Sequence, residues 1–172
     1  AGASRRRHSC RLTAAPVPNP NSAVTSRCIS PACLVSTCAL FQLGRGAEPR
    51  DKVEEFLRQG AEDTGGTLAG LQALLLAASG EDQKAEEKIR KAAEQKVSGR
   101  FHHTAYYIAC AYARMNNPEQ AVYWLQQAVD TGFPCFPLFE QDTNLDPVRQ
   151  DPRFIALMQK LRNQWEHYKA TI

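Results

Sequence analysis

The sequence feature that most constrains the fold is a pattern of small and bulky apolar residues that recurs at an offset of 36 positions. Within each copy the residues follow one another at spacings of three and four, which is the spacing of one face of a helix. Each copy therefore predicts two helical stretches joined by a short turn. The first copy comprises Ala69, Ala73, Leu76, Ala85, Ile89 and Ala92, and the second comprises Ala105, Ala109, Tyr112, Ala121, Leu125 and Ala128.

Residue size in this pattern indicates how the two helices of a copy pack. An alanine such as Ala73 or Ala109 lets a neighbouring helix approach closely, and a bulky residue such as Leu125 fills the groove between helices. One helix pair cannot bury its own apolar face, so pairs of this kind stack. Because the alternation of β-branched residues that marks strands is nearly absent, the sequence predicts an all-α fold of antiparallel helix-turn-helix repeats.

The boundaries of the expected helices are marked by caps and glycines. Residues 66–80 and 100–116 are apolar on nearly all sides, whereas 81–99 and 117–132 are amphipathic. An earlier helix is expected in "DKVEEFLRQG", residues 51–60. The expected helices begin and end at residues suited to those positions. Asn117 can cap the helix that Pro118 begins, and Gly60, Gly99 and Gly132 can end the helices that precede them.

Two Asp-Pro pairs near the C-terminus predict two further helix starts. Asp146 and Asp151 are suited to cap a first turn, and Pro147 and Pro152 lose no hydrogen bond in the first helical position. A short turn should therefore precede a long final helix over 152–168. The apolar stripe of this helix comprises Phe154, Leu157, Met158, Leu161 and Trp165.

The second copy of the pattern resembles the tetratricopeptide repeat (TPR). That family places an aliphatic, a small and an aromatic residue in its first helix, and then alanine, a bulky residue and alanine in its second. The matching residues here are Ile108, Ala109, Tyr112, Ala121, Leu125 and Ala128. The earlier copy departs from the pattern, with Gln72 and Leu76 in the aliphatic and aromatic positions. The stretch "DPVRQDPRF" resembles the closing sequence of bacterial TPR arrays, which implies a TPR-like α-solenoid with a C-terminal capping helix.

The resemblance implies a concave groove, lined by the first helix of each pair, that binds a peptide or a partner helix. The implied groove positions are His103, Tyr106, Cys110 and Arg114 in the second copy and Thr67, Gly70, Leu74 and Ala78 in the first. We therefore expect a non-enzymatic protein-protein interaction module without a cofactor. The alternative is a C-terminal scaffold or regulatory segment of a larger multidomain protein, such as a kinase, a cyclase or a transcription regulator.

Motifs that would indicate an enzyme or a metal site are weak. The sequence holds no phosphate-binding loop, and "DTGG" (63–66) echoes aspartic proteases without the strands or the second copy that they need. The neighbouring His102 and His103 would point about 100° apart on a helix, which does not suit one metal ion. The six cysteines form no C-x-x-C pair, so no zinc site is expected.

Residues 1–47 differ in composition from residues 48–172, which form the expected helical repeat domain. The first 27 residues read as disordered or extended, and 28–44 as a short helix or a processed targeting segment. The net charge of +3 and the interleaved acids and bases do not favour nucleic acid, and no apolar run is long enough to span a membrane. We expect a cytoplasmic protein; an exported, periplasmic or lipid-anchored assembly factor is the alternative if 28–44 is a signal.

Overall fold

The part of the chain that the computed structural model describes is residues 47–58, 63, 65–95 and 101–171. Every regular element in these ranges is a helix, which confirms the predicted all-α class for them. The helices are α2 (Ala47–Arg58), α3 (Thr67–Ala78), α4 (Asp82–Ala93), α5 (Phe101–Arg114), α6 (Pro118–Asp130), α7 (Phe136–Gln141), the 3-10 helix η1 (Thr143–Val148) and α8 (Pro152–Thr171). The interpretation of residues 1–47 lies outside the described residues except for Ala47, which begins α2.

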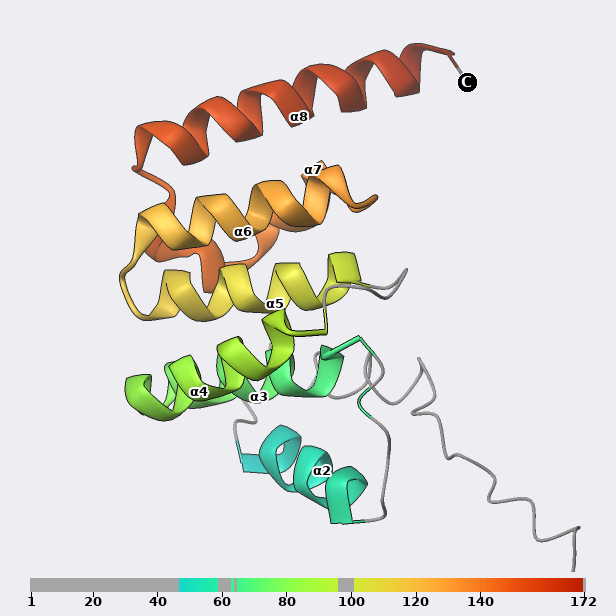
Figure 1. Ribbon diagram of the computed structural model, residues 1–172. Coiled ribbons are helices and arrows are strands. Elements are labelled where there is room, and N and C mark those ends of the chain that lie inside the picture. The colour runs from blue at the N-terminus through green and yellow to red at the C-terminus, as the bar shows by residue number, and fades with distance from the viewer. Residues whose placement is uncertain (1–46, 59–62, 64, 96–100, 172) are drawn as a thin grey trace, which may run out of the picture.

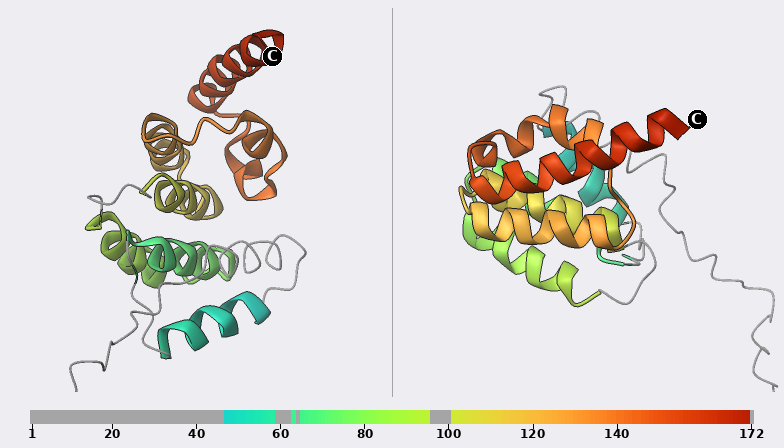
Figure 2. Two further views of the ribbon diagram at one scale, coloured as in Figure 1. Left: turned by 90° about the vertical axis from the view of Figure 1, so that its right-hand side faces the viewer. Right: turned by 90° about the horizontal axis from the view of Figure 1, so that it is seen from above.

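The described helices form successive layers with α2 at one end and α8 at the other (Figure 1), and η1 returns to lie beside α5. Helix α3 packs against α4 and α5, α5 packs against α6 and η1, and α8 packs against α6 and α7. Figure 2 shows the same succession of layers from the side. Helix α5 is the most enclosed element, since every residue over 104–113 is buried.

The repeated pattern faces these helix interfaces. All of its alanines are buried in both copies, and so are Ile89 and Leu125. Leu76 remains partly exposed, whereas Tyr112 at the matching position is buried and its hydroxyl donates to Glu86 at 3.2 Å. The spacing of three and four residues therefore predicted correctly which positions are buried, with the exception of Leu76.

The start of α3 rests on an unpredicted cap. The Asp63 carboxylate accepts the backbone N–H groups of Leu68 and Ala69 at 2.7 and 3.0 Å, in the first turn, where these donors have no partner within the helix. Gly66 precedes the helix with φ 70°, and a Cβ there would lie 2.6 Å from the Ala92 carbonyl oxygen. The aspartate of "DTGG" thus has a structural role in helix capping.

Most predicted helix ends that lie within the described ranges are confirmed. The Asn117 side chain accepts the Gln120 N–H at 3.2 Å, and Pro118 is the first residue of α6. Gly80 and Gly132 follow α3 and α6 with φ of 74° and 113°. Helix α4 ends at Ala93, well before the predicted Gly99, which lies outside the described residues together with Gly60.

The two Asp-Pro pairs have different outcomes. Asp151 does cap α8, because its carboxylate accepts the Arg153 N–H at 2.9 Å. The prediction for Asp146 is wrong: it lies inside η1, with Pro147 beside it, and pairs with Arg149 at 2.6 Å. The turn begins four residues earlier because Asp142 caps it, accepting the Asn144 N–H at 3.0 Å.

The predicted stripe of α8 packs over only part of its length. Phe154, Leu157 and Leu161 are buried and Met158 is partly buried, but 38% of Trp165 is exposed. Helix α8 has 20 residues and α6 has 13. At 1.5 Å per residue the longer helix extends about 10 Å further, and its C-terminal half projects beyond the neighbouring helices (Figures 1 and 2).

Candidate binding surfaces

The structure exposes only two of the eight predicted groove residues, His103 and Arg114. The other six are buried or partly buried: Gly70, Leu74, Tyr106, Cys110, Thr67 and Ala78. Tyr106 and Cys110 are buried because aromatic residues of the segment after α6 cover this part of α5. Tyr106 stacks on Phe139 with ring centroids 5.6 Å apart, so its ring is not free to meet a ligand in this conformation.

A buried carboxylate holds this covering segment on α5. The Tyr106 hydroxyl and the Cys110 thiol both donate to Asp142, the latter at 3.4 Å. Asn144 donates to the same side chain from its backbone and from its amide, at 3.0 and 2.8 Å. Burial is the main reason that the pKa of Tyr106 is raised well above its usual range, and the neighbouring thiol and carboxylate add to it. These contacts describe a satisfied polar cluster in the core.

The paired histidines pack as aromatic rings. His102 and His103 lie 4.2 Å apart between centroids, and both rings contact Phe133, at 5.9 and 5.1 Å. Within the described ranges no group of three or more histidine, cysteine or acidic side chains is placed to hold a metal ion. His103 packs on Phe133 and is also exposed, so it forms part of the protein surface beside the aromatic cluster.

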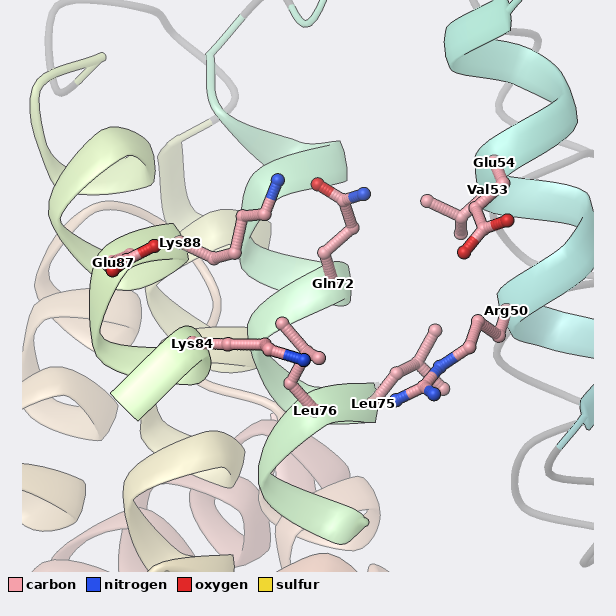
Figure 3. A pocket seen from close by; sticks show the side chains of 9 residues that line it. All are labelled: Arg50, Val53, Glu54, Gln72, Leu75, Leu76, Lys84, Glu87 and Lys88. Atoms are coloured by element: carbon pink, nitrogen blue, oxygen red, sulfur yellow. The ribbon is translucent and has the colours of Figure 1, made fainter. Parts of the chain in front are cut away.

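A cleft of about 260 Å³ opens where α2 meets α3 and α4 (Figure 3). Val53 of α2 and Leu75 of α3 are buried at its base, and the partly exposed Leu76 continues the same apolar surface. Figure 3 shows Gln72 and Lys88 reaching over this surface from α3 and α4, and Arg50 reaching over it from α2. The cleft thus joins an apolar floor to a polar and charged mouth.

An ion-pair network fixes one edge of the cleft. Glu81 accepts from Arg50 and from Lys84, each at 2.7 Å, and thereby links α2 to the first turn of α4. The hydrogen bond from Lys84, followed by that from Arg50, lowers the pKa of the Glu81 carboxyl. The remaining charged side chains around the opening are Glu54, Glu87 and Lys88.

Sequence reasoning did not identify this cleft, although one signal pointed toward it. Three consecutive leucines, Leu74 to Leu76, cannot all face one helix neighbour, because successive residues point about 100° apart. Such a run needs apolar partners on several sides of α3. Helices α4, α5 and α2 supply most of them, and the cleft lies where α2 and α4 leave Leu76 partly uncovered.

Comparison with known proteins finds no protein-family model that matches the chain. No curated protein and no solved structure matches it either. Among the helices of the described ranges, none is both long and apolar enough to cross a lipid bilayer.

Proposed function

We propose that this chain is a non-enzymatic protein-protein interaction module of TPR-like helical repeats. The repeated pattern supports the proposal, because its alanines lie buried where α3 meets α4 and α5 and where α5 meets α6. Helices α7 and η1 together with α8 would form a third, degenerate pair at the C-terminal end. Stacked pairs of this kind present extended surfaces along the array, which is how solenoids bind their partners.

The cleft between α2, α3 and α4 is the observation that carries the proposal. Its volume of about 260 Å³ is below the roughly 300–1,000 Å³ of pockets for small-molecule ligands. A single bulky apolar side chain of a peptide or partner helix fits such a space better than a metabolite. Leu75 and Leu76 would contact this side chain, and the Gln72 amide and the Lys88 ammonium would donate to carbonyl or carboxylate oxygens beside it.

The binding role of the eight predicted groove residues stays a prediction. His103 and Arg114 are accessible on α5 for such a role. Tyr106 and Cys110 would take part only if the segment that begins at Phe133 and ends in η1 moved away from α5. Leu74 is buried in α3 and is not accessible in this conformation. The principal ligand contacts are therefore expected from Leu76, Gln72 and Lys88 in the cleft, and not from the predicted groove.

A peptide selection tests the proposed function. A phage-displayed library of random peptides is selected on the full chain, and the bound peptides are measured against Leu76→Asp. Loss of an apolar side-chain contact is expected to weaken binding by at least about tenfold, because such a contact contributes roughly 1.5–3 kcal/mol. The matched control is Leu138→Asp, a partly buried leucine of α7 outside the cleft. Peptides whose affinity is unchanged by Leu76→Asp would count against the cleft as the binding surface.

A further inference from the structure

A second apolar surface, independent of the cleft, lies between α7 and α8. Phe136 of α7 and Phe154 and Met158 of α8 form a shallow hollow of about 260 Å³, with Ile155 at its edge. This hollow lies at the C-terminal end of the stack, where Figure 1 shows α8 as the final layer. Ile155 is 52% exposed and Trp165 is 38% exposed, so this end leaves large apolar side chains in contact with solvent.

The exposed residues of α8 have the spacing of a helix-packing seam. Ile155, Met158, Arg162 and Trp165 follow one another at i, i+3, i+7 and i+10, which is the heptad alternation of two helices packed side by side. The face formed by Phe154, Leu157 and Leu161 is already buried. The seam therefore lies beside the buried face and fits one additional helix.

The charges around the hollow favour a partner with the same charges. Arg162 pairs with Glu140 at 2.9 Å and lies over the Phe136 ring at 5.3 Å, and Arg149 pairs with Asp146 at 2.6 Å. The two cations beside the hollow thus each have an anion in the same copy, and the ion pairs surround an apolar centre without excess charge. When such a surface meets a copy of itself across a two-fold axis, neither copy brings an unpaired charge to the contact. A strongly acidic or basic partner would find no such match.

We propose that two copies of this chain associate through this face, with α8 of one copy antiparallel to α8 of the other. With the two-fold axis near residue 160, Ile155 of each copy lies opposite Trp165 of the other. Met158 then lies opposite the stem of Arg162, whose charge is already neutralised by Glu140. The dimer buries the apolar residues that a single copy leaves exposed at the end of the stack.

Sedimentation equilibrium of the full chain over a wide concentration range tests the association. The expected mass rises with concentration from 19.1 kDa toward twice that value. Ile155→Glu combined with Trp165→Glu should abolish the rise, because like charges would meet across the axis. Tyr123→Glu, at a half-exposed aromatic of α6, is the matched control and should leave it unchanged. A wild-type chain that stays at 19.1 kDa at every concentration would overturn the proposal.

A mixing experiment then distinguishes a two-fold contact from contact with a different surface. The doubly acidic variant and a doubly basic one (Ile155→Lys with Trp165→Lys) should each remain monomeric alone and associate when mixed in equal amounts. Only a surface that meets itself gives this rescue, because each acidic residue then faces a basic one. Circular dichroism of each variant checks that the helices are retained. Failure of the folded variants to associate on mixing would exclude the two-fold arrangement.

Discussion

The hydroxyl of Tyr106 donates its hydrogen bond to the buried carboxylate of Asp142 and so joins the central helix α5 to the start of η1. The two residues are 36 positions apart in the chain. From the same helix α5, the Tyr106 ring stacks on Phe139, and the Cys110 thiol donates to Asp142 at 3.4 Å. This contact explains why the predicted groove is covered here.

Removing the donor of this contact should weaken the fold measurably. Tyr106→Phe keeps the ring stacked on Phe139 but leaves Asp142 with one hydrogen bond fewer. Hydrogen bonds to charged groups contribute roughly 1.5–3 kcal/mol, so the free energy of unfolding in urea should fall by about that amount. Asp142→Ala should cost more, since it leaves several buried donors without an acceptor. A Tyr106→Phe protein as stable as the wild type would show that this bond contributes little.

Two glycines with similar backbone angles should respond differently to alanine. Gly66 and Gly80 have φ of 70° and 74°, but a Cβ at Gly66 would meet the backbone of Ala92, whereas at Gly80 nothing lies within 4 Å. Gly80→Ala should therefore lower the free energy of unfolding only by the strain of a left-handed alanine, about 1–2 kcal/mol. Gly66→Ala adds a clash that a backbone cannot easily relieve, so its melting temperature should fall further. Equal losses in the two variants would contradict the close approach of α3 to α4.

The Tyr112 hydroxyl should resist ionisation at high pH. Burial, with a smaller contribution from the charge of Glu86, raises the pKa of Tyr112 from 10.0 to about 12. Since the neutral form is the favoured one in the fold, this stabilising contribution is complete below pH 10 and is lost as the pH rises through about 12. Phenolate absorbance, taken as the difference between wild type and Tyr112→Phe, measures this step. Glu86→Gln should shift it to lower pH; a step that does not move would exclude a contribution from Glu86.

The cap of α8 should lose its charge only in strong acid. The hydrogen bond from the Arg153 guanidinium, supported by the Arg153 backbone N–H, lowers the pKa of the Asp151 carboxyl from 3.8 to about 2. Because this pKa is depressed in the fold, its stabilising contribution is complete above about pH 4 and is lost as the pH falls through about 2. A carboxyl-carbon NMR titration measures the midpoint. In Arg153→Ala the midpoint should move up toward the ordinary value, and an unmoved midpoint would show that the side-chain contact is not the cause.

The periodicity of small and bulky residues predicted the helices and their buried faces, because it depends only on local geometry. Ala109 and Leu125 are buried as expected. The same periodicity does not identify which neighbour covers a face. Tyr106 and Cys110 were expected to line an open groove, but they contact Asp142 in a segment whose short helices have no strong period. The sequence does not indicate the cap at Asp142 for a related reason. Asp142 caps η1 at a buried position beside α5, and local sequence carries no signal of that burial. Asp146, by contrast, precedes a proline and so fits the local pattern of a helix cap.

The candidate cleft could not be predicted from the sequence, because it depends on the angle at which α2 packs against α3 and α4. Val53, Leu76 and Lys88 come from three different helices. Their spacing along the chain carries no signal of proximity. Only the run of three leucines indicated that α3 needs partners on several sides.

The position of α2 at the end of the described helices also affects how firmly one wall of the cleft is held. Helix α2 packs chiefly against α3, with the Arg50–Glu81 ion pair linking it to α4, whereas α5 is buried throughout residues 104–113. Local opening requires the least free energy where fewest buried contacts are broken. Amide protons of α2 should therefore exchange with solvent well before those of α5. A ligand seated on Leu76 would slow exchange in α2, so part of its binding free energy would be used to hold that wall closed.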